Sequence, residues 1–112
     1  MAKLLISPEA QQNIDHQEDF LVDEAGIEVA LRFHDALLHA LHRLVEMPEL
    51  GSLREFLNPR LHGLRMWPIP GFPNYLVYYR LVGDELQVLW VLHGAQDRDR
   101  ISVDQDEQSD SP

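Results

Sequence analysis

The first half of the chain repeats its apolar residues with the period of an α-helix. A short apolar run at Lys3–Ile6 predicts an opening strand. Ser7, Pro8 and Glu9 then predict a helix start, because serine caps helix N-termini, proline suits the first helical position and an acid suits the first turn. We expect this helix to end near Phe20. Its apolar stripe is thin, so it needs a neighbour to pack on; the stripe consists of Ala10, Ile14 and then Phe20 or Leu21.

A second helix is predicted over residues 27–45, where apolar residues recur at helical spacing: Ala30, Phe33, Leu37, Leu41 and Leu44. Leu31, Leu38 and Val45 widen this side, enough to meet both a helix and a sheet. The polar loop 23–26 (DEAG) predicts an antiparallel helical hairpin, and residues 47–51 (MPELG) end the second helix with proline and glycine.

The second half of the chain changes to the pattern of strands. Candidate strands cover residues 61–69, 74–81 (NYLVYYRL) and 86–93 (LQVLWVLH). Gly83-Asp84 favours a type II′ hairpin turn between the last two. That turn sets the expected register, in which one uncharged face packs on the helices; the opposed pairs are Leu81 with Leu86, Tyr79 with Val88, Val77 with Trp90 and Tyr75 with Leu92.

The other face of this hairpin mixes polar and apolar groups, as a surface offered to a partner does. It is expected to place Leu76, Tyr78 and Arg80 opposite Val91, Leu89 and Gln87, with Asn74 opposite His93. Residues 71–73 are expected to form a turn, whose Phe72 either anchors a partner or caps the core. The predicted partner-binding residues are Phe72, Tyr78, Arg80, Leu89, Val91 and His93.

These elements predict an α+β fold, with an N-terminal strand and a two-helix antiparallel hairpin packed on a three- to four-stranded antiparallel sheet. With 112 residues, 45% of them hydrophobic, the chain is long enough for one core. We expect a single domain over residues 1–101 and a disordered acidic tail over 102–112. The chain has no cysteine, no signal-like segment and no apolar run of membrane-spanning length, which fits a cytoplasmic protein.

The formal net charge of −10 is unevenly distributed. Residues 1–50 carry ten acids against three bases, and the segment 102–112 carries four acids and no base, whereas residues 51–101 hold six arginines against five acids. Proteins that bind nucleic acid directly usually carry an excess of Lys and Arg. We therefore expect no direct, sequence-specific binding of nucleic acid.

Three sequence motifs carry a resemblance to a known family. The segment 71–97 contains Tyr79-Arg80 at the end of one strand and Val91-Leu92-His93-Gly94-Ala95 at the end of the next. The start ISPEAQQNI and the segment Leu64-Arg65-Met66-Trp67-Pro68 precede it in the same order as in that family. Over about residues 4–97 the chain resembles ParE-type plasmid-stabilisation toxins of the RelE/ParE superfamily, the toxin half of type II toxin–antitoxin systems.

The resemblance implies a toxin that inhibits DNA gyrase, without a cofactor or a metal ion, and that forms a hetero-oligomer with a ParD-like cognate antitoxin. The RelE-type branch of the superfamily instead contains ribosome-dependent mRNA interferases. Under that alternative, Arg65, Arg80 and His93 would share proton transfer and the phosphate charge. Asn74 and Gly94 stand where nuclease members tend to have basic residues, and the only lysine is Lys3, so no catalytic residue is expected. A decayed member that only binds antitoxin is the third possibility.

Each candidate residue also has a structural role that could explain it. His93 could steady the strand end, and Arg65 and Arg80 could cover apolar surface with their stems. Trp67, Trp90, Tyr75 and Tyr79 are expected to pack in the core or a groove rather than stack on bases. Asp35, His39, His42 and Glu46 line one helical face at the spacing of a metal site, but such a face is usually only solvated, and we expect no metal there.

Overall fold

The computed structural model describes residues 2–54 and 61–94. Within these ranges the chain forms an α+β fold, which confirms the predicted class. The elements in chain order are β1 (Lys3–Ile6), α1 (Pro8–Ala25), α2 (Ile27–Glu46), β2 (Ser52–Leu53), β3 (Arg65–Ile69), β4 (Phe72–Val82) and β5 (Glu85–His93). The predicted domain boundary at residue 101 and the predicted tail 102–112 lie outside the described residues.

The two helices form the predicted antiparallel hairpin. Ser7 caps α1, and its hydroxyl accepts a hydrogen bond of 3.0 Å from the Ala10 N–H. The expected end near Phe20 and the expected loop 23–26 are wrong, because α1 continues to Ala25 and Gly26 alone makes the turn. Gly26 has a φ of +95°, a conformation that side chains with a Cβ rarely adopt. The turn therefore depends on this glycine.

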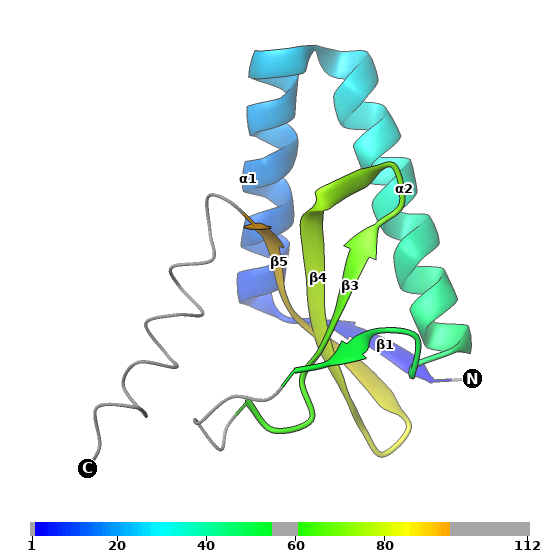
Figure 1. The fold of residues 1–112 in the computed structure, drawn as a ribbon. Helices are drawn as coiled ribbons and strands as arrows, with labels where there is room; N and C mark the ends of the chain where they lie inside the picture. Colours follow the sequence, from blue (N-terminus) through cyan, green and yellow to red (C-terminus); the bar gives the residue numbers. More distant parts are fainter. Residues whose placement is uncertain (1, 55–60, 95–112) are drawn as a thin grey trace.

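The strands form one sheet in the order β1-β5-β4-β3-β2. It has five strands rather than the expected three or four, because the two-residue strand β2 adds to one edge. The strand β1 pairs in parallel with β5, from Lys3 opposite Glu85 to Ile6 opposite Val88, and the other pairings are antiparallel. Figure 1 shows both helices on the same side of this sheet.

The strand β3 begins at Arg65, so the expected strand over residues 61–69 is too long. Residues 61–63 form a turn instead. The expected turn at residues 71–73 is also displaced, since Phe72 and Pro73 already belong to β4. Pro70 and Gly71 connect β3 to β4, and Gly71 has a φ of +86°. Proline followed by a glycine of positive φ is the pattern of a type II turn.

The hairpin of β4 and β5 has the predicted register near its turn and a different one beyond it. Gly83 has a φ of +62°, as the first position of a type II′ turn requires. Leu81 pairs with Leu86 and Tyr79 with Val88, as predicted, but Tyr78 then pairs with Trp90. Leu89 is thus an extra residue, a β-bulge, between Val88 and Trp90. The bulge reverses the side to which every later residue of β5 points.

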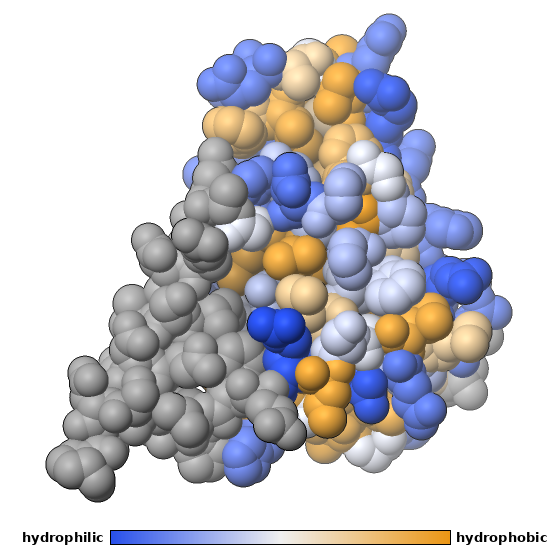
Figure 2. All heavy atoms as spheres, in the orientation of Figure 1, coloured by the Kyte–Doolittle hydropathy of each residue, from blue (hydrophilic) through white to orange (hydrophobic). Residues whose placement is uncertain are grey.

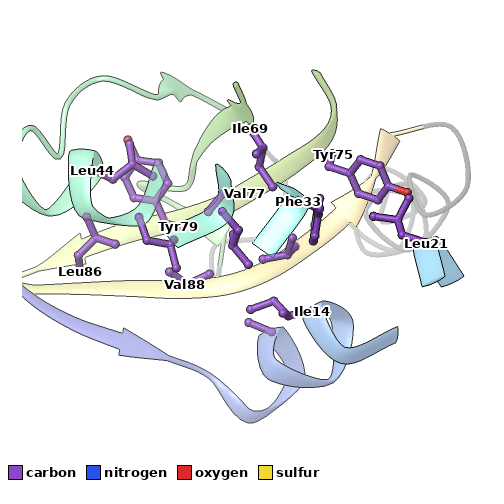
Figure 3. Packing of buried hydrophobic residues seen from close by; sticks show 14 of the residues in the cluster. Ile14, Leu21, Phe33, Leu44, Ile69, Tyr75, Val77, Tyr79, Leu86 and Val88 are labelled. Carbon is purple, nitrogen blue, oxygen red and sulfur yellow. The ribbon is translucent and has the colours of Figure 1, made fainter. Parts of the chain in front are cut away.

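The bulge corrects the predicted faces of the sheet. Val77 pairs with Val91 instead of Trp90, and Tyr75 pairs with His93 instead of Leu92. The helix-facing core therefore contains Val91, whereas Trp90 and Leu92 lie on the other side. Figure 3 shows this main core between the sheet and the helices. Its fully buried members are Phe33, Leu37, Leu41, Leu44, Ile69, Val77, Tyr79, Leu86, Val88 and Val91, with Ala10 of α1.

A second apolar cluster covers part of the face that was expected to be open. Leu61 and Leu64, from the turn before β3, are buried there with Tyr78 and Leu92. Four half-buried residues surround them: Met66, Leu76, Leu89 and Trp90. This cluster is why the loop before β3 contains two buried leucines without being a strand.

Polar groups of α1 complete the edge of β5 beyond the end of β1. The Ser7 hydroxyl donates to the Leu89 carbonyl at 3.1 Å, and the buried Val91 N–H donates to the Asn13 side-chain oxygen at 3.1 Å. Asn13 is 7% exposed, and Gln17, one turn later, is buried with it. The apolar stripe of α1 is thin because polar side chains, Asn13 and Gln17, occupy two of its five buried positions.

Replacing Asn13 by alanine should lower the free energy of unfolding by about 1–3 kcal/mol, because it leaves the buried Val91 N–H without an acceptor. Urea denaturation of the purified chain measures the change. Gln12→Ala, on the exposed side of the same turn, is the matched control and should change stability little. Equal effects of the two substitutions would contradict the role given to Asn13.

Candidate partner-binding surface

The β-bulge divides the six predicted partner-binding residues between the two sides of the sheet. Val91 is wrong as a contact residue, because it is fully buried in the main core. Tyr78 is 7% exposed within the second cluster, and Leu89 lies half-buried beside it. The predicted surface is therefore smaller than expected, since of these three residues only Leu89 is half-exposed.

Phe72 lies against the core, which answers the question that the sequence left open. Its ring meets the ring of Phe33 edge-on, with centroids 5.4 Å apart and planes at 88°, and that of Tyr75 at 6.3 Å. Such edge-to-face pairs are favourable arrangements of aromatic rings. Phe72 caps the core, and a contact of its half-exposed side with a partner stays a prediction.

His93 and Arg80 lie on opposite sides of the sheet. His93 pairs with Tyr75, not Asn74, and the two rings stack edge-on with centroids 4.9 Å apart. Because Tyr75 belongs to the main core, His93 is on the helix-facing side. Arg80 follows Tyr79 and therefore points to the other side, where its Nε donates to Gln87 Oε1 at 3.2 Å.

The Arg65 side chain forms hydrogen bonds with the loop that follows α2. Its guanidinium donates to the carbonyl of Gly51 at 2.8 Å and approaches that of Glu49 at 3.4 Å. Tyr79, which pairs with Arg65 in the sheet, binds the same loop through its hydroxyl. Its buried hydroxyl donates to the Pro48 carbonyl at 2.7 Å and accepts from the Gly51 N–H at 2.8 Å. Together these two side chains fix residues 48–51 against the sheet.

The three residues of the nuclease alternative do not meet at one point. Arg65 and His93 pair with Tyr79 and Tyr75, four residues apart along β4, which is about 13 Å at the rise of a strand. Arg80 lies on the opposite side of the sheet from both. In-line cleavage of RNA needs a base, an acid and cations around a single phosphate. These three side chains cannot supply that arrangement in this fold.

Burial raises the pKa of the hydroxyls of Tyr78 and Tyr79 above their ordinary value of 10.0. Arg54 opposes the rise at Tyr78, and the Gly51 N–H and Arg65 oppose it at Tyr79. A raised folded-state pKa means that stability is complete below pH 10.0 and falls as the pH rises through the raised value, because the unfolded chain releases these protons first.

We therefore expect urea denaturation to show a decline in stability beginning above the ordinary tyrosine pKa. The double variant Tyr78→Phe/Tyr79→Phe should be less stable at pH 7 but should lose less stability between neutral and alkaline pH. A decline of the same steepness in the double variant would show that other groups cause it.

The predicted metal-like face of α2 contains one close pair. His42 and Glu46 approach to 3.7 Å, and both side chains are more than half exposed. Across residues 2–54 and 61–94, no group of three or more His, Asp or Glu side chains is arranged to hold a metal ion. Neither helix is long and apolar enough to cross a membrane.

The helical hairpin exposes an apolar stripe that sequence reasoning assigned to the core. Leu31 and Leu38 are 56% and 51% exposed, and Ile27 on the same face of α2 is 59% exposed. Their spacing of four and seven residues was the available signal, since it places them on one helical face. Val22 of α1 is exposed beside the turn, and Figure 2 shows apolar side chains gathered at this end of the hairpin.

A polar pair crosses the hairpin at the stripe. His34 lies between Leu31 and Leu38 on α2, and its Nδ1 is 2.6 Å from the Glu18 carboxylate of α1. This contact links the two helices near the exposed residues Leu31 and Leu38. We call Val22, Ile27, Leu31 and Leu38 the hairpin stripe.

Comparisons with known proteins agree with the fold and with the resemblance. Residues 4–98 match the family described as the ParE toxin of the type II toxin–antitoxin system parDE. The protein named Toxin ParE1 from two strains of Mycobacterium tuberculosis is 27% identical over 100 residues, which is 88% of this chain and 96% of that protein. A chain in the solved structure of a chromosomal ParDE system from P. aeruginosa superposes with a TM-score of 0.68 at 22% identity, covering 83% of this chain and 96% of its own.

Proposed function

Because the chain belongs to the ParE toxin family of type II toxin–antitoxin systems, we propose that it inhibits DNA gyrase in the cytosol and that a cognate, ParD-like antitoxin neutralises it. The relatives are named as ParE toxins and as part of a ParDE system. We extend both the gyrase target and the antitoxin partner from the family to this chain.

The hairpin stripe is the observation that carries the antitoxin part of the proposal. Its four aliphatic side chains are each more than a third exposed. A soluble monomer rarely leaves a contiguous apolar surface uncovered unless a partner binds there. An antitoxin segment that folds as it binds could lay apolar residues at helical spacing along this stripe. Asp35 is exposed on α2 next to Leu31 and Leu38 and would form part of the polar rim of such an interface.

Charge and geometry support gyrase over the ribosome as the target. The ribosome presents polyanionic RNA, which repels a chain of net charge −10. Arg65, Arg80 and His93 lie apart, so the catalytic set of the mRNA interferase alternative is not assembled from them. Inhibition of gyrase requires binding of a protein surface and no cleavage chemistry in the toxin.

Controlled expression with and without the adjacent reading frame tests the proposal. We expect induction of the toxin alone to stop growth and trigger a DNA-damage response, and co-expression of the antitoxin to restore growth. In vitro, the purified chain should inhibit supercoiling by gyrase. Codon-specific cleavage of mRNA after induction would favour the interferase instead, and unchanged growth with intact antitoxin binding would identify a decayed, non-toxic member.

Replacing Leu31 by aspartate should weaken antitoxin binding at least about tenfold while leaving the fold intact, because it places a charge in the centre of an apolar contact. Isothermal titration of antitoxin into the variant measures the affinity. His39→Asp makes the same change of charge on an exposed face of α2 outside the stripe and is the matched control. Wild-type affinity in Leu31→Asp would remove the stripe from the antitoxin interface.

A further inference from the structure

The contact between Glu18 and His34 lies within an otherwise apolar row of side chains on the helical hairpin. On α2, Ile27, Leu31 and Leu38 of the hairpin stripe are exposed, and His34 falls between the two leucines. The resulting spacing of four, three and four residues keeps all of these side chains on one face of a helix. His34 and its partner Glu18 therefore place a polar pair in the middle of an apolar surface.

The length of this row indicates what kind of segment can cover it. Ile27 and Leu38 are eleven residues apart, which is about 17 Å at the rise of an α-helix. Apolar residues at intervals of three and four are the pattern with which one helix packs on another. A partner helix of about three turns with the same pattern would cover the row from end to end. Such a helix would also cover the contact between Glu18 and His34.

The Glu18 carboxylate has filled only part of its capacity to accept hydrogen bonds. Its Oε2 accepts a hydrogen bond of 2.6 Å from Nδ1 of His34, which carries the proton because a carboxylate can only accept. Within residues 2–54 and 61–94, no other hydrogen bond or ion pair reaches Glu18. The Glu18 side chain is 26% exposed, so solvent can satisfy its remaining acceptor sites in the free toxin.

A helix docked along the row would remove this solvent. Leu31 and Leu38 lie on either side of His34, and Val22 follows Glu18 by one turn of α1, so apolar side chains surround the pair on both helices. Burial of an ionised carboxylate is strongly unfavourable unless the partner supplies hydrogen-bond donors and a positive charge. A lysine or arginine side chain supplies both. The covering helix therefore needs a cation at the position that faces Glu18.

The other charges on this face of the hairpin favour the same partner. Arg32 and Arg43, the only lysine or arginine residues of the two helices, lie about 100–140° around α2 from the nearest residues of the stripe. His42, one turn after Leu38, contacts Glu46 at 3.7 Å. Four exposed acids border the pair and the row: Asp15, Asp19, Glu28 and Asp35. A partner helix with positive charge along its edges would complement this face.

We propose that the antitoxin binds the hairpin as an amphipathic helix and places the cation of a lysine or arginine against Glu18, so that this contact fixes the register of the helix and discriminates between antitoxins. The inference rests on the proposed function, since it names the chemistry of the antitoxin segment that covers the hairpin stripe. Aliphatic contacts alone would let a partner helix shift along the row, because Ile27, Leu31 and Leu38 offer it similar surfaces. One polar contact within an apolar row removes that freedom. His34 is the positioning residue, because it holds the Glu18 carboxylate in place.

Isothermal titration of the antitoxin from the adjacent reading frame into full-length toxin variants tests the contact. Glu18→Gln keeps an acceptor for His34 but removes the charge, so it should weaken binding at least about tenfold. Glu24→Gln makes the same change of charge at an exposed position about 120° around α1 from Glu18. This matched control should weaken binding less than about threefold. Thermal unfolding verifies that both variants retain the fold.

Reversal of the charges on both sides identifies the residue of the antitoxin. Glu18→Lys should weaken binding at least about a hundredfold, because it places two cations together in a covered site. Each lysine and arginine in the toxin-binding half of the antitoxin is then replaced by glutamate in turn. One of these antitoxin variants should bind Glu18→Lys at least about tenfold more tightly than it binds the wild-type toxin.

Unchanged affinity in Glu18→Gln, or tighter binding by Glu18→Leu, would show that the antitoxin covers the pair without a cation and would overturn the inference. The proposed function and the stripe would still stand if Leu31→Asp weakened binding in the same experiment. Equal losses in Glu18→Gln and Glu24→Gln would reveal a general effect of charge, which also overturns the inference. Absence of antitoxin binding by the wild-type chain would overturn both proposals.

Discussion

Phe33→Ala is expected to lower the free energy of unfolding by about 3–5 kcal/mol, a large part of the stability of a domain of this size. Phe33 is fully buried in the centre of the main core. Its ring makes edge-on contacts with Phe72 and with Tyr75, whose centroid is 4.9 Å away. Alanine would leave a cavity between α2 and β4 that these rings can fill only in part.

The measurement is urea denaturation followed by circular dichroism, and the matched control lies two residues away on the same helix. Leu31→Ala removes an exposed aliphatic side chain of similar hydrophobicity and should change the free energy of unfolding by less than about 0.5 kcal/mol. Among folded molecules the order should be reversed for antitoxin affinity, so that Leu31→Ala binds antitoxin more weakly than Phe33→Ala. A similar loss of stability in both would place Leu31 in the core and contradict the hairpin stripe.

The contact between Tyr79 and the loop after α2 predicts the second large effect. Gly51→Ala should lower the free energy of unfolding by about 3 kcal/mol, because it overpacks a closed site. A Cβ added at Gly51 would lie 2.5 Å from the Tyr79 hydroxyl oxygen and 2.7 Å from its ring. Tyr79 is fully buried, so its ring has no space into which to move.

Removing only the Tyr79 hydroxyl should lower the free energy of unfolding by less than Gly51→Ala does. Tyr79→Phe leaves the Pro48 carbonyl and the Gly51 N–H without their partner and should cost about 2 kcal/mol. Gly94→Ala is the control for the glycine change, since a Cβ there meets its nearest atom, the Asn74 carbonyl oxygen, at 3.4 Å. Thermal unfolding of the three variants gives the comparison. A Gly51→Ala protein as stable as Gly94→Ala would show that the loop can move away from Tyr79.

Residues close together in the sequence were sufficient to predict most of the helices and strands. Ser7 and Pro8 define the start of α1 through capping and backbone geometry, and Gly83-Asp84 defines the hairpin turn, because these effects act within a few residues. The parallel pairing of β1 with β5 and the two-residue strand β2 depend on contacts between distant segments. The sequence of either segment alone contains no signal for them.

The β-bulge at Leu89 is the main reason why the predicted surface was only partly right. An unbroken alternation from the turn is the simplest register, and it places Trp90 with the core and Val91 outside. Both residues are apolar, so hydrophobicity could not reveal the shift. The role of Arg65 also depends on its position in the fold. An arginine can bind phosphate, but the Arg65 guanidinium donates hydrogen bonds to the carbonyls of Gly51 and Glu49 instead.

The hairpin stripe, proposed to bind antitoxin, could be seen in the sequence only as part of the wide apolar side of α2. Leu31 and Leu38 appeared to widen the core face of α2, because periodicity cannot show which side of a wide apolar stripe is covered. Glu46 and Asp84 line the same hollow although 38 positions separate them, because the end of α2 lies beside the tip of the β4–β5 hairpin.

The parallel pairing of β1 with β5 has a consequence for synthesis. Residues 3–6 find their strand partners only at residues 85–88, and Ser7 reaches the Leu89 carbonyl across 82 positions. At ordinary translation rates of about 5–20 residues per second, the amino-terminal strand waits roughly 4–16 seconds for its neighbour. Any nascent chain that stops before residue 85 lacks β5, which lies between β1 and β4 in the sheet, so a prematurely terminated product cannot complete the fold.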